Sequence, residues 1–211
     1  MNYAVLLLVV VLGAQANARV VVNRQDPVVK TRHFDPRKPP KEMPPLDFPE
    51  IAVTDSKVQA AVGFSTLVVE EKKNADGTST ATVKVTAAQV DLTAAITIWL
   101  PLKVDKKTTI HEEAHRQIAE HYYGSADQKA SQIARTYIDR TFSATAPTSD
   151  EAANAAMQKG MEEFGREFMK AFHEPMSRTQ QIFDRITDHG RNTVDEQKAI
   201  EQAIKEAAQK R

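Results

Sequence analysis

The sequence predicts an α+β fold, a small antiparallel β-sheet followed by a mostly helical half. Residues 51–102 are rich in β-branched side chains and alternate between apolar and polar positions, which is typical of strands. From Lys106 onward, apolar residues instead recur at steps of three and four, the spacing of amphipathic helices. With 211 residues, the chain is long enough for one ordinary domain.

Residues 1–18, MNYAVLLLVVVLGAQANA, form an uncharged apolar run that ends in small residues. This pattern is typical of a signal peptide and predicts export, with cleavage after Ala16 or Ala18. The run carries no basic residue near Met1, so an uncleaved anchor is the alternative. No later segment has the length and apolarity of a membrane span, and we expect no membrane association after cleavage.

Residues 19–49 are predicted to be a proline-rich linker or pro-segment without a core of its own. They contain seven of the ten prolines among scattered charges. Proline fixes φ and lacks an amide hydrogen, so a dense run of prolines disfavours helices and strand ladders. The folded domain is therefore expected at residues 50–211, with its β part at 50–105 and its helical part at 106–211.

Turn and capping signals divide both parts. Asp76 and Gly77 separate two alternating runs and predict a hairpin turn. In the helical part, we expect breaks at Gly124, Pro147, Pro175 and Gly190. Capping-box spacing predicts helix starts at Thr148 with Glu151 and at Thr193 with Glu196. One apolar stripe is predicted to belong to the core, and it comprises Met157, Met161, Phe164, Phe168 and Phe172.

Composition excludes several classes of function and site. Lysine plus arginine (28) equal aspartate plus glutamate (28), so no overall field favours nucleic acid, and we expect no nucleic-acid partner. Cysteine is absent, which excludes disulfides and thiolate zinc sites. Any zinc would be held by histidine nitrogen and carboxylate oxygen.

Such ligands occur in TTIHEEAHRQIAEHYYGS, residues 108–125, which contains a complete HExxH motif. On a helix, His111 and His115 lie about 40° apart around the axis and about 6 Å apart along it, so both imidazoles reach one ion. Glu112 is then placed to accept a proton from water activated by the metal. The structural alternative is that Glu112 only caps the start of a helix, because Thr109 and Glu112 have capping-box spacing.

A third ligand is not settled by this segment. His121 reproduces the histidine spacing of HExxHxxGxxH, but Ile118 replaces the glycine that breaks the helix there, so we expect the helix to carry His121 away from the ion. The next predicted helix offers Asp127 and Asp139.

Further along, His189 precedes a glycine and has Asp184 and Asp188 nearby to orient an imidazole. A histidine before a C-terminal glycine is, however, also a common way to end a helix.

The order of these motifs resembles a family of exported bacterial proteins catalogued as a domain of unknown function and described as predicted secreted zinc-dependent proteases. The resemblance covers about residues 55–205. It lies in the apolar leader, the stretch ITIWLP, the motif HEEAH and an aromatic-Asp-x-x-Thr-x-His-Gly motif. Here that last motif is Phe183, Asp184, Thr187, His189 and Gly190. The chain departs from the family pattern at Ala114 and Thr193, where the family often has glycine and glutamine.

The resemblance implies a zincin-like metallopeptidase that is secreted or periplasmic and acts on peptides or proteins. His111 and His115 would bind Zn²⁺, with Glu112 as the general base. The resemblance also makes His189 the third ligand, and Asp184 would orient an imidazole. The rival hypothesis is a non-catalytic envelope adaptor or metal-binding module with a degenerate HExxH. A fourth protein ligand such as Glu120 or Asp188 would favour that rival, because structural zinc sites are closed.

Overall fold

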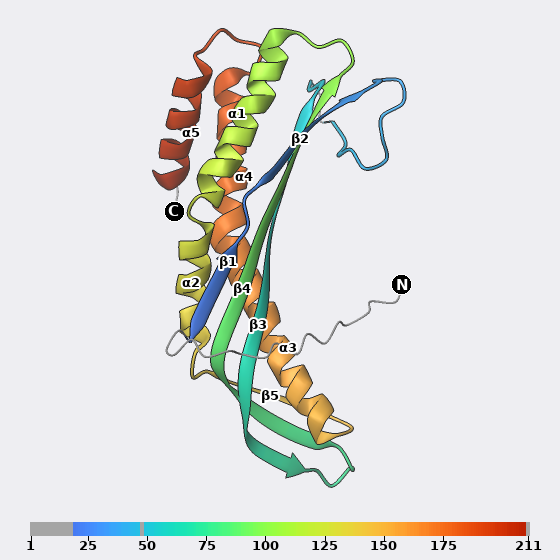
Figure 1. Cartoon of the computed structure of the whole chain (residues 1–211), viewed down its shortest axis with the longest axis vertical. Helices are drawn as coiled ribbons and strands as arrows, with labels where there is room; N and C mark the ends of the chain where they lie inside the picture. Colours follow the sequence, from blue (N-terminus) through green and yellow to red (C-terminus); the bar gives the residue numbers. More distant parts are fainter. Residues whose placement is uncertain (1–18, 47–48, 210–211) are drawn as a thin grey trace.

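A computed structural model of the chain describes residues 19–46 and 49–209 (Figure 1). The predicted signal peptide lies outside the described residues. The fold is α+β, as predicted: helices pack against a long, narrow sheet over most of its length (Figure 1). Among the described residues, no helix combines the length and apolarity needed to cross a membrane.

A long hairpin forms most of the sheet. Strand β3 (Val53–Lys73) pairs antiparallel with β4 (Ser79–Pro101), and the predicted turn holds Gly77 at φ 88°. Since β3 pairs with β4 along nearly its whole length, the other strands share the opposite edge of β4. These are β5 (Thr141–Ala146), which is antiparallel to β4, and β1 (Val20–Arg24) and β2 (Val28–Phe34), which are parallel to it.

The linker prediction for residues 19–49 is therefore wrong over its first half, and the sheet is mixed and not purely antiparallel. The segments VVVNR and VVKTRHF contain no proline and are rich in β-branched residues. Pro27 lies between them, where a missing amide hydrogen breaks no ladder. Phe34 ends β2 as a buried residue, so this segment contributes to the folded body.

The helices follow in the order α1 (Lys106–Tyr123), α2 (Ala126–Tyr137), α3 (Ser149–Phe168), the π-helical turn η1 (Met169–His173), α4 (Glu174–Thr187) and α5 (Glu196–Gln209). The capping box of Thr148 and Glu151 is confirmed. The break expected at Pro175 is absent: the chain stays helical from α3 through η1 into α4, and Pro175 is the second residue of α4, directly after the π-helical turn. α5 begins later than predicted, since Asp195 accepts from the Lys198 amide and Glu196 is the first helical residue.

Of the four apolar cores among the described residues, the two largest hold these layers together. The larger core lies between the sheet and helices α2 and α3. It confirms the predicted stripe, with Phe164, Phe168 and Phe172 buried and Met157 and Met161 packed at its margin. The smaller core joins α1, α4 and α5 through Ile118, Phe183 and Ile200. This second core fixes the packing of α1 on α4, and the candidate site lies between these two helices.

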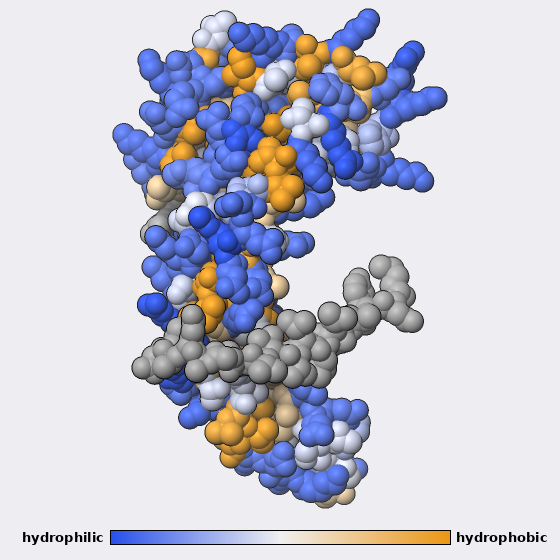
Figure 2. Space-filling model, in the orientation of Figure 1, coloured by the Kyte–Doolittle hydropathy of each residue, from blue (hydrophilic) through white to orange (hydrophobic). Residues whose placement is uncertain are grey.

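The surface in the view of Figure 2 is mainly hydrophilic, with hydrophobic residues in separate patches. Exposed large apolar side chains of β3 include three consecutive residues, Leu67, Val68 and Val69.

Candidate metal centre

Helix α1 carries the HExxH motif and starts before it. Asp105 is the N-cap residue and accepts a hydrogen bond from the Thr108 amide, so Glu112 does not cap this helix. The helix continues without a break to Tyr123, as Ile118 predicts, and His121 lies exposed beyond the motif. His111 and Glu112 are each 4% exposed. The capping interpretation of Glu112 is therefore excluded, and His121 is not brought to the other histidines.

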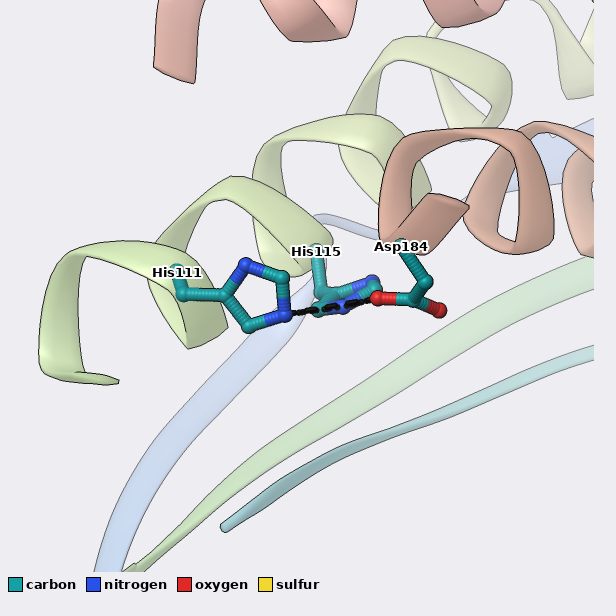
Figure 3. A group of neighbouring side chains, drawn as sticks. All are labelled: His111, His115 and Asp184. Atoms are coloured by element: carbon teal, nitrogen blue, oxygen red, sulfur yellow. Dashed lines mark hydrogen bonds and ion pairs between the residues drawn. The ribbon is translucent and has the colours of Figure 1, made fainter. Parts of the chain in front are cut away.

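Three ligand atoms converge between α1 and α4 (Figure 3). Asp184 Oδ1 lies 2.8 Å from His115 Nε2 and 3.3 Å from His111 Nε2. The two Nε2 atoms lie 3.2 Å apart. Adjacent ligands on a tetrahedral zinc ion, with bonds of about 2.0–2.2 Å, are separated by about 3.3 Å. The three atoms thus have the spacing of one face of such a tetrahedron, and these residues could hold one metal ion together.

The site's ionisation follows from this convergence. Burial alone would lower the pKa of His115, but the hydrogen bond and the negative charge of Asp184 outweigh it and raise that pKa to about 9. Burial alone would raise the pKa of Asp184, and hydrogen bonds from His111 and His115 reverse the effect, so that pKa lies below its usual range. The two histidines and the Asp184 carboxylate therefore favour opposite charges at this point of the fold.

Gln180 fixes the orientation of His115. Its Oε1 accepts from His115 Nδ1, and its Nε2 donates to the His115 carbonyl oxygen at 3.0 Å. With the proton on Nδ1, the lone pair of Nε2 is directed to the site. Gln180 lies one helical turn before Asp184, so α4 presents both side chains on one face.

The C-terminal motif packs around His111. The Phe183 ring lies 5.0 Å from each histidine ring and is stacked on His111. Thr187 Oγ1 donates to the Phe183 carbonyl at 2.9 Å and lies 3.4 Å from the Gly190 amide nitrogen, which ties the turn to the helix end. Gly190 lies against the imidazole, because a Cβ added there would be 2.9 Å from His111 Cγ.

His189 does not join the two histidines of α1, contrary to the expected ligand set. Asp188 and His189 have positive φ values of 51° and 52° in the turn that ends α4, and this turn directs the His189 ring elsewhere. Its Nδ1 lies 3.2 Å from Glu50 Oε1. The side chain of Asp184, assigned to an orienting role from the sequence, takes the position between His111 and His115. Asp184 also belongs to a second possible ligand group, with Glu50 and His189.

Glu112 lies beside these atoms but is not one of them. Thr54 of β3 donates to its Oε2 at 2.8 Å and also lies 2.9 Å from its carbonyl oxygen. Burial raises the pKa of Glu112, while the charge of His115 and the Thr54 hydrogen bond oppose that rise. A carboxylate with a raised pKa is suited to accept and return a proton. A cavity of about 400 Å³ reaches Glu112, His115 and Asp184.

Glu196 is a further acidic group near the site that sequence reasoning assigned only to a helix cap. Its Oε2 is buried without a hydrogen-bond partner among the described residues, as is His111 Nδ1. Burial raises the pKa of Glu196, and the charges of His111 and His115 oppose the rise. At the start of α5, Glu196 is therefore close enough to both histidines to interact with them electrostatically.

Comparison of the chain with protein-family models, curated proteins and solved structures finds no match.

Proposed function

We propose that this protein is a zinc-dependent metallohydrolase, specifically a peptidase, in which His111, His115 and Asp184 hold the metal. The observation that carries the proposal is the convergence of two Nε2 atoms and one carboxylate oxygen at mutual distances of 2.8–3.3 Å. Two imidazoles with one carboxylate form a donor set typical of catalytic zinc. Such sites keep one coordination position for water or substrate.

The other side chains have roles that suit hydrolysis. Bound zinc would supply a Lewis acid and lower the pKa of a water molecule. Glu112 would accept a proton from water and return it to the leaving group, and Thr54 holds the carboxylate in place through its hydrogen bond. Gln180 keeps His115 in the tautomer that offers Nε2 to the metal. The adjoining cavity gives substrate a route to Glu112.

The alternative is a non-catalytic envelope adaptor or metal-binding module. Two features favour the enzyme. Glu112 stays outside the group of converging atoms, where a base is needed, and the site opens into a cavity, with no fourth ligand joining the three atoms among the described residues. His189 is then free of the zinc and paired with Glu50.

For location, we propose that the protein is exported to the bacterial periplasm or secreted. The support is the apolar leader at residues 1–18 with its small residues before the expected cleavage points.

Metal analysis and digestion of a peptide mixture test the function together. Purified protein should contain about one zinc ion per chain and should cleave peptides. Glu112→Gln should retain the zinc and lose hydrolysis, because a base that is not a ligand can be replaced without releasing the ion. Glu113→Gln is the matched control: it removes an ion pair with Arg116 on the same helix and should leave both properties intact. Hydrolysis that persists in Glu112→Gln, or zinc-loaded protein that cleaves nothing, would refute the proposal.

A further inference from the structure

We propose that the substrate is an extended peptide that pairs with the free edge of β3 beside the metal site, and that His173 ends this pairing. On that side of the scissile bond the protein would then bind only about three residues. This inference rests on the proposed hydrolase function and specifies its substrate class.

The cavity at the metal site has an edge strand as one wall. Val53, Thr54 and Ser56 of β3 line it, α4 lies opposite, and Glu112 and His115 lie in the same cavity. β4 pairs with one edge of β3, and none of the other described strands pairs with the edge that faces the cavity. An unpaired strand edge offers a row of backbone donors and acceptors that an extended peptide can join.

The direction of these backbone groups follows from one contact. The Val58 carbonyl oxygen accepts a hydrogen bond from His173 Nε2 at 3.0 Å, so the backbone N–H and C=O groups of Val58 point away from β4. In an antiparallel strand, alternate residues direct both N–H and C=O to the same side. The pairing of β3 with β4 is regular from Val53 to Ser65. The backbone groups of Thr54 and Ser56 therefore point to the same side as those of Val58, toward the cavity.

His173 limits how many of these groups a peptide can use. β3 begins at Val53, and the side chain of His173 occupies the hydrogen-bonding position at Val58. Between these limits only Thr54 and Ser56 remain, and the distance from Thr54 to Val58 is about 13 Å. The edge therefore suits a short peptide or a chain end, not the middle of a long strand.

The π-helical turn η1 is the element that places His173 there. It inserts an irregular turn between α3 and α4, with Phe172 buried in the main core and His173 against β3. π-helical turns of this kind occur frequently at functional sites. In this protein the neighbouring helical residues pack into the core, and the turn places the polar side chain of His173 at the end of the cavity that it lines.

Digestion of random decapeptides by the zinc-loaded full-length protein, with mass spectrometry of the products, tests the inference. The wild-type protein should release one fragment of no more than about three residues from each cleavage. The His173→Ala variant should also cleave peptide bonds further from the chain end. Cleavage at these bonds should rise about fivefold for each additional hydrogen bond between the peptide and the edge of β3.

Two further variants control for misfolding and for loss of a histidine. His173→Gln keeps an amide donor for Val58 and should retain the wild-type pattern. His121→Ala removes an exposed histidine of α1 and should also leave the pattern unchanged. Even cleavage along the decapeptides by the wild-type protein, or a wild-type pattern in His173→Ala, would overturn the inference.

A binding measurement separates failure of this inference from failure of the hydrolase proposal. Pooled random tetrapeptides added to zinc-loaded Glu112→Gln protein should slow hydrogen exchange at the Ser56 amide. If that protection appears while the wild-type protein cleaves nothing, the hydrolase proposal fails and the β3 edge site stands. If peptides are cleaved without protection of Ser56, the edge site is refuted and the hydrolase proposal stands.

Discussion

Gly190 packs directly against the imidazole of His111, and an added Cβ would lie 2.9 Å from His111 Cγ. Gly190 also has φ 72°, a conformation that favours glycine. The glycine of the C-terminal motif thus sets the position of the first histidine of HExxH, although the two residues are far apart in the sequence.

Gly190→Ala should therefore displace His111, lowering the free energy of unfolding by about 1–3 kcal/mol and weakening zinc binding. Gly77→Ala is the matched control, because Gly77 has φ 88° in the hairpin turn but no atom within 4 Å of an added Cβ. It should cost about 1 kcal/mol and leave zinc affinity unchanged. Denaturant unfolding and zinc titration of both variants measure the difference, and equal zinc affinity in the two would contradict the packing argument.

Gln180→Ala should weaken zinc binding by about 10- to 100-fold, because His115 loses the hydrogen bonds that fix its tautomer and ring orientation. The adjacent Gln181 is exposed, and Gln181→Ala should leave the affinity unchanged. Competition with a chromogenic chelator measures both. If Gln180→Ala bound zinc as tightly as wild type, His115 would not depend on α4 for its orientation.

Thr54→Val should keep zinc and lower kcat, with little change in KM, because it removes the hydrogen bond that positions Glu112 and preserves the side-chain volume. A loss of about 10-fold is expected for a base that remains present but is less well placed. Steady-state kinetics on a peptide cleaved by the wild-type protein checks the split. Loss of zinc would show that Thr54 supports the ligands and not the base.

Phe34→Ala should lower the free energy of unfolding by about 3 kcal/mol, since Phe34 is 4% exposed at the end of β2. Val28 begins the same strand at 54% exposure, and Val28→Ala should change stability by less than about 1 kcal/mol. Chemical denaturation compares the two variants. Equal, negligible effects would mean that residues 19–49 form the mobile segment that their proline content suggests.

The parts of the site that could be predicted from the sequence are those set by local geometry. His111 and His115 lie four apart on one helix, so their convergence needs no tertiary information, and Ile118 was enough to predict that His121 moves away. Asp184 was recognised as near the site, but its position relative to His189 depends on the turn that ends α4. That turn places three successive residues at positive φ, which no propensity argument anticipates.

Long-range contacts account for most of what could not be predicted. Thr54 and Gln180 reach the HExxH helix from 58 and 65 residues away, and only the packing of β3 and α4 on α1 brings them there. The i, i+4 spacing of Gln180 and Asp184 was the available signal, because it places both on one helix face. The strands β1 and β2 contain no proline and pair with β4, but the high proline content averaged over residues 19–49 concealed them.

The most direct test of the central claim is the zinc dissociation constant of Asp184→Ala measured beside those of His115→Ala, His189→Ala and His121→Ala. If Asp184 is the third ligand, Asp184→Ala should lose zinc affinity about as severely as His115→Ala. His189→Ala and His121→Ala should bind zinc within about 10-fold of wild type, since a residue outside the ligand set acts only indirectly. Tight zinc binding by Asp184→Ala together with loss of zinc in His189→Ala would contradict the assignment and make His189 the third ligand.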